Sequence, residues 1–378
     1  MEFTIEKDYF VSAVSDVIKV IPNNTTLPIL KGIKITVQEN GIILVGSNSN
    51  ITIEKFIPCV VEDKSVIHIH ATGAIVVNAK YLFEIIKKLP DNISLKKFNN
   101  NLEIQSGGVK TKLNCYEVND YPLLPHNNSS NMITLEGKEL SEIIKQTLFS
   151  VSKSETRPIL TGVNITFTDG LATYVATDSY RLAITKQHTP VSKPDFGSIT
   201  IPSSSLAELL RLTNNYTGSI DIYMSDSHII FIIGDITLFS TVLSGYYPSV
   251  DNLLPTEFKT KVTIDTKSFL QGIERANLLA SDLRHNSIQL EIINDSKIEI
   301  SSNSTEIGQI TEIQDIEFIT GESHQLKISF GGQFMIDALK AIKTEKISIK
   351  FNGAMRPILI EPINNPDTLY LISPVRSY

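Results

Sequence analysis

Hydrophobic positions follow the spacing of an amphipathic helix in three segments that begin 130 residues apart, at Met1, Asn131 and Lys261. Each segment opens with a short strand of alternating polar and apolar residues, followed by a polar turn. The helix after the turn carries one apolar stripe, which is typical of a helix that buries one face. The stripes consist of Phe10, Val14, Val17 and Ile18, of Leu140, Ile143, Ile144 and Leu148, and of Phe269, Ile273 and Ala276.

A second helix is predicted later in each segment, at residues 79–90, 204–213 and 331–342. Runs rich in Ile, Val and Thr lie between the helices and predict strands. One such run, "SIDIYMSDSHIIFII", contains a turn signal at Ser225 and Asp226. The order of predicted elements is therefore the same in the three segments.

Whole phrases also recur, because "TLPILKGIKITV" at 26–37 closely matches "TRPILTGVNITF" at 156–167. The 378 residues divided by three give 126 per unit, which is too long for a solenoid repeat. We predict an α+β fold used three times, with two helices packed on a sheet in each copy. The predicted domains are residues 1–128, 129–256 and 257–378. Three such units in one chain favour an arc or a ring.

Composition narrows the class of protein. The share of hydrophobic residues, 42%, is that of a packed globular protein, and the net charge of -7 argues against a protein that binds nucleic acid over its whole surface. Basic residues gathered on one inner face remain compatible with that charge. Cys59 and Cys115 stand alone, and the N-terminus lacks an apolar signal core, so a reduced, cytoplasmic chain is expected.

Five short phrases carry a resemblance to a known family. They are "TLPILKG", "SETRPILTGV", "ATDSYRLA", "GAMRPILI" and "PVRSY". Their order and spacing over the whole chain resemble the bacterial sliding clamp, the beta subunit of the replicative DNA polymerase. The resemblance implies a head-to-tail homodimer whose two three-domain arcs close into a ring around double-stranded DNA. It also implies a clamp loader that opens the ring, and a DNA polymerase and other partners that bind it through short peptides. No membrane partner is expected.

The resemblance implies that helices line the hole of the ring and face DNA. The positions expected there are Asn24, Lys80, Lys87, Lys88, Lys153, Arg211, Lys340 and Lys343. Surface helices carry lysines in most proteins, so solvation alone is the competing interpretation. The family usually has Arg at the position of Asn24, and basic residues are common at Ser203 and Ser204. Direct contact with DNA is therefore expected to be weaker, with a shallower dependence on salt.

A hydrophobic cleft between the second and third domains binds partner peptides in the family. Carried over by motif, its residues are Leu160, Thr177, Ser179, Tyr180, Arg181, Leu182, Pro248, Leu253, Met355, Pro357, Leu371, Ser373, Pro374, Val375 and Arg376. An apolar pocket with a few polar groups suits peptide capture. Ordinary core packing would also explain Leu182 and Leu371. Tyr180 stands where the family often has His, and Ser373 where a larger apolar residue is common, so a preference for different partners is expected.

The dimer interface is expected at Leu278 and Leu279, which break the apolar stripe of the third repeated helix. By resemblance they meet the region of Leu113 in the other subunit. Burial within their own domain is the alternative.

Signals for an enzyme are poor, and no catalytic residue, metal or cofactor is expected. His68 and His70 share a strand face without a third ligand nearby. Asp178 and Ser179 with the distant His188 lack a nucleophile-elbow motif. Three hypotheses remain at this point: a processivity clamp, a paralogous clamp with a specialised partner set, and a three-repeat hydrolase or metal enzyme.

Overall fold

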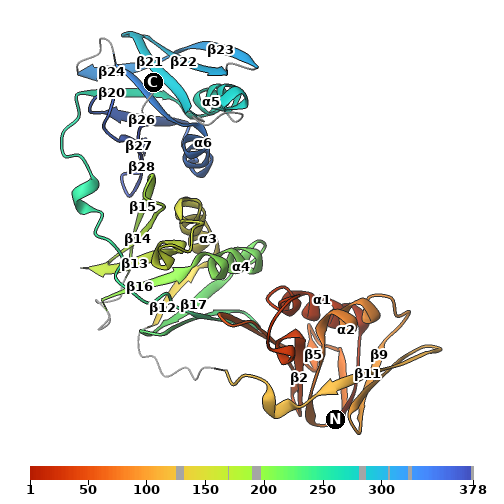
Figure 1. Cartoon of the computed structure of the whole chain (residues 1–378). Helices are drawn as coiled ribbons and strands as arrows, with labels where there is room; N and C mark the ends of the chain where they lie inside the picture. The colour runs from red at the N-terminus through yellow and green to blue at the C-terminus, as the bar shows by residue number, and fades with distance from the viewer. Residues whose placement is uncertain are drawn as a thin grey trace. The chain divides into compact units, whose positions relative to one another are not determined.

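The computed structural model describes residues 1–124, 132–168, 170–189, 197–280, 287–304, 307–321 and 326–375. It consists of two compact units. The first comprises Met1–Leu140 and Ser204–Val242, and the second comprises Ser141–Ser203 and Leu243–Tyr378. Figure 1 shows the helices and strands along the chain. The three domain ranges predicted from the sequence stay a prediction.

All six predicted helices are present. They are α1 (Lys7–Ile18), α2 (Ala79–Ile86), α3 (Gly137–Thr147), α4 (Ser203–Thr213), α5 (Thr266–Ala280) and α6 (Gly332–Ala341). Phe10, Val14 and Val17 are buried on α1, and Phe269, Ile273 and Ala276 are buried on α5, so the apolar stripes face the core as predicted. Five short 3-10 helices also occur in the described residues: η1 (Pro28–Lys31), η2 (Val118–Asp120), η3 (Leu148–Ser150), η4 (Pro158–Thr161) and η5 (Asp251–Leu253). No helix in these ranges combines the length and the apolar character needed to span a bilayer.

One long sheet organises the first unit. In spatial order its strands are β12 (Met132–Glu136), β17 (Ser219–Met224), β18 (His228–Ile233), β19 (Ile236–Thr241), β4 (Ile51–Pro58), β3 (Gly41–Ser47), β2 (Gly32–Gln38), β8 (Gly73–Asn78), β11 (Val109–Tyr116), β10 (Asn101–Ser106), β9 (Ile93–Phe98), β1 (Glu2–Ile5) and β7 (Ile67–Ala71). Two short strands, β5 (Val60–Val61) and β6 (Lys64–Ser65), pair separately. Helices α1 and α2 pack against each other and against β3, β4 and β8 (Figure 1). The rings of Phe3 and Phe10 meet edge to face in this core, with centroids 6.3 Å apart.

Two sheets organise the second unit. The larger contains β16 (Ser198–Pro202), β13 (Gly162–Thr168), β14 (Leu171–Thr177), β15 (Arg181–His188), β28 (Thr368–Ile372), β27 (Ile358–Pro362), β26 (Lys346–Phe351), β20 (Thr260–Asp265) and β24 (Phe318–Gly321). The smaller contains β23 (Gly308–Asp315), β22 (Lys297–Ser304), β21 (Ser287–Asn294) and β25 (Lys327–Gly331). A core that includes Phe269, Phe330 and Tyr370 lies where α5 and α6 pack on these strands.

The same kind of strand pairing occurs once in each unit and links neighbouring repeats. In the first unit β4 pairs antiparallel with β19, and Ile53 lies opposite Leu238. In the second unit β15 pairs antiparallel with β28, and Leu182 lies opposite Leu371. Both pairings extend a sheet from one repeat into the next, so backbone hydrogen bonds bind consecutive repeats together.

Candidate functional site

The site predicted from "ATDSYRL" is built on the tight turn between β14 and β15. The carboxylate Oδ1 of Asp178 accepts hydrogen bonds from the backbone N–H groups of Tyr180 at 2.9 Å and Arg181 at 3.0 Å. Asp is favoured at such a position because its short side chain can satisfy backbone donors two and three residues on. Ser179 adopts a left-handed backbone with φ 77°. The turn therefore presents the side chains of Ser179 and Tyr180 outward, and both are exposed.

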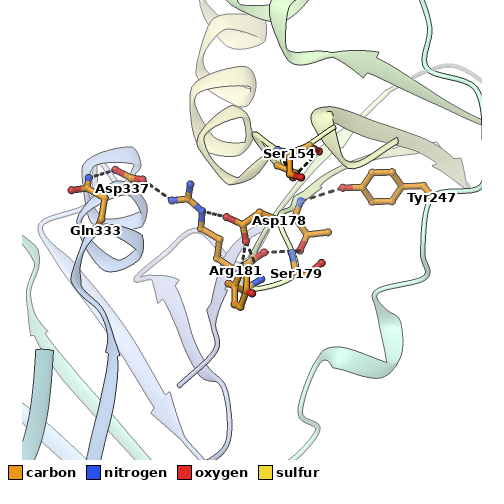
Figure 2. Close-up of polar contacts among 10 residues, drawn as sticks. Ser154, Asp178, Ser179, Arg181, Tyr247, Gln333 and Asp337 are labelled. Atoms are coloured by element: carbon orange, nitrogen blue, oxygen red, sulfur yellow. Dashed lines mark hydrogen bonds and ion pairs between the residues drawn. The ribbon is translucent and has the colours of Figure 1, made fainter. Parts of the chain in front are cut away.

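Arg181 is the centre of a buried ionic network (Figure 2). Its Nε donates to Oδ2 of Asp178 at 2.9 Å, and its Nη1 donates to Oδ2 of Asp337 on α6 at 2.6 Å. The guanidinium carbon lies 4.8 Å from the ring centroid of Phe334 and 5.5 Å from that of Phe149. The Arg181 side chain is only 8% exposed. Its Nε and Nη1 donors are directed at internal partners, so Arg181 supports the turn from the buried side.

Tyr180 lies on the exposed side of this network. Its side chain is 64% exposed, and its ring stacks on Phe334 with centroids 6.3 Å apart and planes inclined by 16°. The carbonyl oxygen of Tyr180 accepts a hydrogen bond from the backbone N–H of Ser373 at 2.8 Å. The turn is thereby tied both to α6 and to the C-terminal segment.

An apolar cluster lies beside the turn and contains three of the predicted residues, Leu160, Leu182 and Leu371. The cluster consists of Leu160, Val175, Leu182, Ile184, Tyr247, Val250, Leu359 and Leu371. The hydroxyl of Tyr247 accepts a hydrogen bond from the backbone N–H of Thr177 at 3.1 Å (Figure 2). Burial raises the pKa of the Tyr247 hydroxyl, so it stays protonated at neutral pH. Leu160, Leu182 and Leu371 are therefore core residues in this structure.

Four of the residues predicted for the cleft carry exposed apolar side chains, and we call these four the rim residues. Tyr180, Leu253, Met355 and Val375 are 64%, 53%, 56% and 38% exposed. Pro248 is also exposed, whereas Pro357, Ser373 and Pro374 are half-buried. Thr177 is buried, and its hydroxyl donates to the carbonyl of Arg181 at 2.6 Å. Arg376 lies outside the described residues.

Sequence reasoning missed the residues that hold Arg181 in place. Phe149, Phe334 and Asp337 carry no motif that would connect them with Arg181. Tyr247 was detectable, because the phrases "DYP" at 120–122 and "YYP" at 246–248 place a Tyr before Pro in two repeats. Tyr121 is the counterpart in the first unit, and its hydroxyl donates to the carbonyl of Val45 at 3.1 Å.

Comparisons with known proteins find matches over nearly the whole chain. Three family models match: the DNA polymerase III beta subunit N-terminal domain at residues 1–125, its central domain at 134–249 and its C-terminal domain at 251–376. The chain belongs to the sliding clamp family, the beta subunits of bacterial DNA polymerase III. It is 40% identical to the beta sliding clamp of Bacillus subtilis over 380 residues and 39% identical to that of Staphylococcus aureus over 381 residues. Both matches cover 100% of each chain. The crystal structure of the DNA polymerase sliding clamp from Bacillus subtilis superposes with a TM-score of 0.95 and covers all of both chains.

The cations predicted to face DNA differ in the ion pairs that they form. Lys80, Lys88 and Lys153 are exposed and form no ion pair within the described ranges, and Asn24 is exposed as well. Lys87 lies 3.7 Å from Glu84, Lys340 lies 2.8 Å from Glu274 and Lys343 lies 2.6 Å from Glu142.

Arg211 is the most strongly engaged of the predicted cations. Its Nε donates to Glu208 at 2.8 Å, and its Nη2 donates to the carbonyl oxygen of Asp16 at 2.7 Å. The Arg211 side chain is 31% exposed. It therefore links α4 to α1 within the first unit and has fewer donors left for a phosphate than the lysines have.

Two strand edges lie near the residues predicted for the dimer interface, since Leu113 is on β11 and the helix that carries Leu278 and Leu279, α5, packs against β23. In the first unit β11 pairs with β8 only through Cys115 and Tyr116, so residues 109–114 have no described strand partner on that side. In the second unit β23 is the outer strand of its sheet. Leu278, on α5, is 72% exposed, while Leu113 and Leu279 are half-buried. Arg275 donates to both carboxylate oxygens of Glu312 on β23 at 2.7 and 2.6 Å, and this holds the pKa of Glu312 below its usual value.

The residues of the enzyme hypothesis are not assembled into a site. His68 and His70 are exposed on β7, and no group of three His, Cys, Asp or Glu that could hold a metal occurs in the part of the chain that the structure describes. Asp178 caps the turn before β15, whereas His188 is the last residue of that eight-residue strand. Asp178 and His188 are therefore held apart, because the extended strand between them rises by about 3.3 Å per residue.

Proposed function

We propose that two copies of this chain join head to tail into a closed ring that encircles duplex DNA and tethers the replicative polymerase. The pair of unpaired strand edges supports this function most directly. A copy presents β11 on its first unit and β23 on its second, so each ring contact joins two different edges. Such a heterologous contact closes into a ring when the rotation per subunit is right.

The side chains at the two edges suit this contact. On β11, Thr111 and Leu113 lie on the same sheet face as the buried residues Ile104 and Leu102 opposite them. On β23, Ile310 packs partly against the core of the second unit. Strand addition across the edges would continue the sheet from one copy to the next, with Leu113 and Leu278 covering each other on the helix side. Hydrogen bonds between backbones then give affinity and the apolar pairs give register.

The DNA contacts of such a ring need only be loose. Linkage around the duplex replaces tight binding, so exposed lysines such as Lys80 and Lys88 can meet phosphates without fixing a sequence. The ring itself is non-catalytic in this proposal. A clamp loader opens it with ATP, and partners dock through short peptides on the rim residues Tyr180, Leu253, Met355 and Val375. We place this activity in the cytoplasm, with the chromosome.

Retention on circular DNA tests the ring. The protein is loaded onto nicked circular DNA with the host's loader and ATP, the circle is cut with a restriction enzyme, and the bound fraction is followed by gel filtration. We expect retention on the circle and loss of most of the bound protein after cutting, because a closed ring slides off free ends. Protein that stays on linear DNA to the same extent would show direct binding and would contradict encirclement.

The second candidate is a paralogous clamp with a narrowed set of partners, favoured by Asn24, Tyr180 and Ser373. If the chain is the main clamp, the clamp-binding peptide of the replicative polymerase should bind with a micromolar dissociation constant in isothermal titration. Met355→Asp should weaken that binding about tenfold or more, because it places a charge in an apolar contact. The matched control is Ile293→Asp, which changes an exposed apolar residue of β21 that is not among the predicted cleft residues. If the wild-type protein did not bind the polymerase peptide, the paralogous clamp would be favoured.

A further inference from the structure

The first unit contains a cavity of about 490 Å³ where the end of α1 meets the start of α2. We call it the α1–α2 pocket. Its lining residues are Ile18, Lys19, Ile21, Pro22, Asn23, Lys31, Asn78, Lys80, Tyr81, Phe83 and Glu84. The volume falls within the range of about 300–1,000 Å³ that is common for small-molecule sites. All of the lining residues belong to the first unit, so the geometry of the pocket depends only on that unit.

The lining of this pocket contains more basic than acidic side chains, although the net charge of the whole chain is -7. Lys19, Lys31 and Lys80 line it, and none of them has an ion-pair partner in the described parts of the chain. The one carboxylate in the lining, Glu84, lies 3.7 Å from Lys87 outside the pocket. Three uncompensated ammonium groups around one cavity favour an anionic occupant. Lysine binds phosphate as a point charge and without directional demands.

The aromatic residues of the pocket indicate an anion that also carries a flat ring. Tyr81 is 61% exposed, although a ring of that size is usually more buried. Its backbone N–H is bonded at 3.3 Å to the side-chain oxygen of Asn78, which caps α2 and fixes where the ring emerges. The half-buried Phe83 and the side chains of Ile18 and Ile21 supply apolar surface next to it. Lysines with an exposed ring are the usual means of holding single-stranded nucleic acid.

We propose that the α1–α2 pocket binds an unpaired nucleotide of single-stranded DNA. The base stacks on Tyr81, and the flanking phosphates lie among Lys19, Lys31 and Lys80. A base within a duplex cannot enter, because its faces are covered by its neighbours in the stack. The pocket adds to the proposed ring a site that distinguishes single strands from duplex. A ring that slides along duplex would therefore pause where one strand ends.

Binding of a fluorescein-labelled dT10 oligonucleotide, measured by fluorescence anisotropy at about 50 mM salt, tests this site without any need for ring closure. Tyr81→Ala should raise the dissociation constant about tenfold or more, the effect of losing one stacked base. Tyr81→Phe keeps the ring and should bind as the wild type does. Phe98→Ala removes another exposed ring of the first unit, 52% exposed, and should also leave binding unchanged. Circular dichroism confirms that each variant is folded.

Further ligands and variants test whether the bound group is an unpaired nucleotide. A decanucleotide of abasic sites should bind the wild type and Tyr81→Ala equally weakly, and a decamer duplex should show no dependence on Tyr81. The double variant Lys31→Gln, Lys80→Gln should weaken the binding of dT10. It should also reduce the slope of log affinity against log salt concentration by the contribution of about two phosphate contacts. Photocrosslinking of dT10 that carries 5-iodo-deoxyuridine should map to Tyr81. Unchanged affinity of Tyr81→Ala, equal Tyr81 dependence for duplex, or a crosslink only at Tyr180 would overturn the proposal.

Discussion

Arg181→Met should lower the free energy of unfolding of the second unit by about 3 kcal/mol, the lower end of the cost of removing one partner from a buried ion pair. The variant leaves the carboxylates of Asp178 and Asp337 without their cation. These side chains are 15% and 26% exposed, so water compensates for only part of the loss. Methionine keeps an unbranched apolar side chain at this position, next to Phe149 and Phe334. The loss therefore reports on charge and not on a cavity.

Urea unfolding with hydrogen exchange read out by mass spectrometry measures this effect, because exchange assigns it to a unit. Peptides from residues 170–189 and 326–341 should exchange faster, while peptides from the first unit should not change. Arg356→Met is the matched control, since Arg356 is an exposed arginine of the same unit. A double-mutant cycle with Asp337→Asn should give a coupling energy of about 1 kcal/mol or more. If Arg181→Met and Arg356→Met lowered the free energy of unfolding by the same small amount, the ion pairs of Arg181 would not stabilise the second unit.

The backbone turn of the site is set by local sequence, whereas its side-chain network is not. Asn48 in the first repeat and Asp178 in the second, 130 residues later, form the same turn. The side-chain oxygen of Asn48 accepts from the backbone N–H groups of Asn50 and Ile51, both at 2.8 Å. Local rules were sufficient here, because the turn depends on residues that are adjacent in sequence. The second repeat differs by having Arg181 where the first has Ile51.

The partners of the predicted cations could not be read from the sequence, because they are distant along the chain. Asp337 follows Arg181 by 156 residues, and the carbonyl of Asp16 that Arg211 contacts lies 195 residues away. Periodicity marks which side of a helix is polar, and it correctly left Lys80, Lys87 and Lys88 on the surface of the first unit. It carries no information on which polar residues meet across packed elements. The positions of the six helices were predictable for the opposite reason, since one apolar stripe decides each of them.

Leu278→Asp should convert the proposed dimer into monomers and raise its dissociation constant about 100-fold or more, the scale of a central interface residue. Leu278 is 72% exposed in the isolated chain and becomes covered only if the β23 edge meets another copy. The aspartate would then bring a charge into an apolar contact without a partner. Sedimentation velocity over a concentration series measures the change, and Ile293→Asp serves as the control for an added charge in the same unit. A dimer of unchanged affinity in Leu278→Asp would exclude this edge from the interface.

A mixing experiment then tests whether the contact is head to tail. Leu278→Asp has an intact β11 edge, and a Leu113→Asp variant has an intact β23 edge. Each variant alone lacks one half of every contact and should be monomeric. Mixed one to one, they share one intact contact and should form an open heterodimer, because only two unlike edges can pair. The heterodimer cannot close, so it should load onto circular DNA without being retained there. An interface that pairs identical edges would leave the mixture as monomers or return homodimers, and retention of the mixture on circles would contradict the two-edge ring.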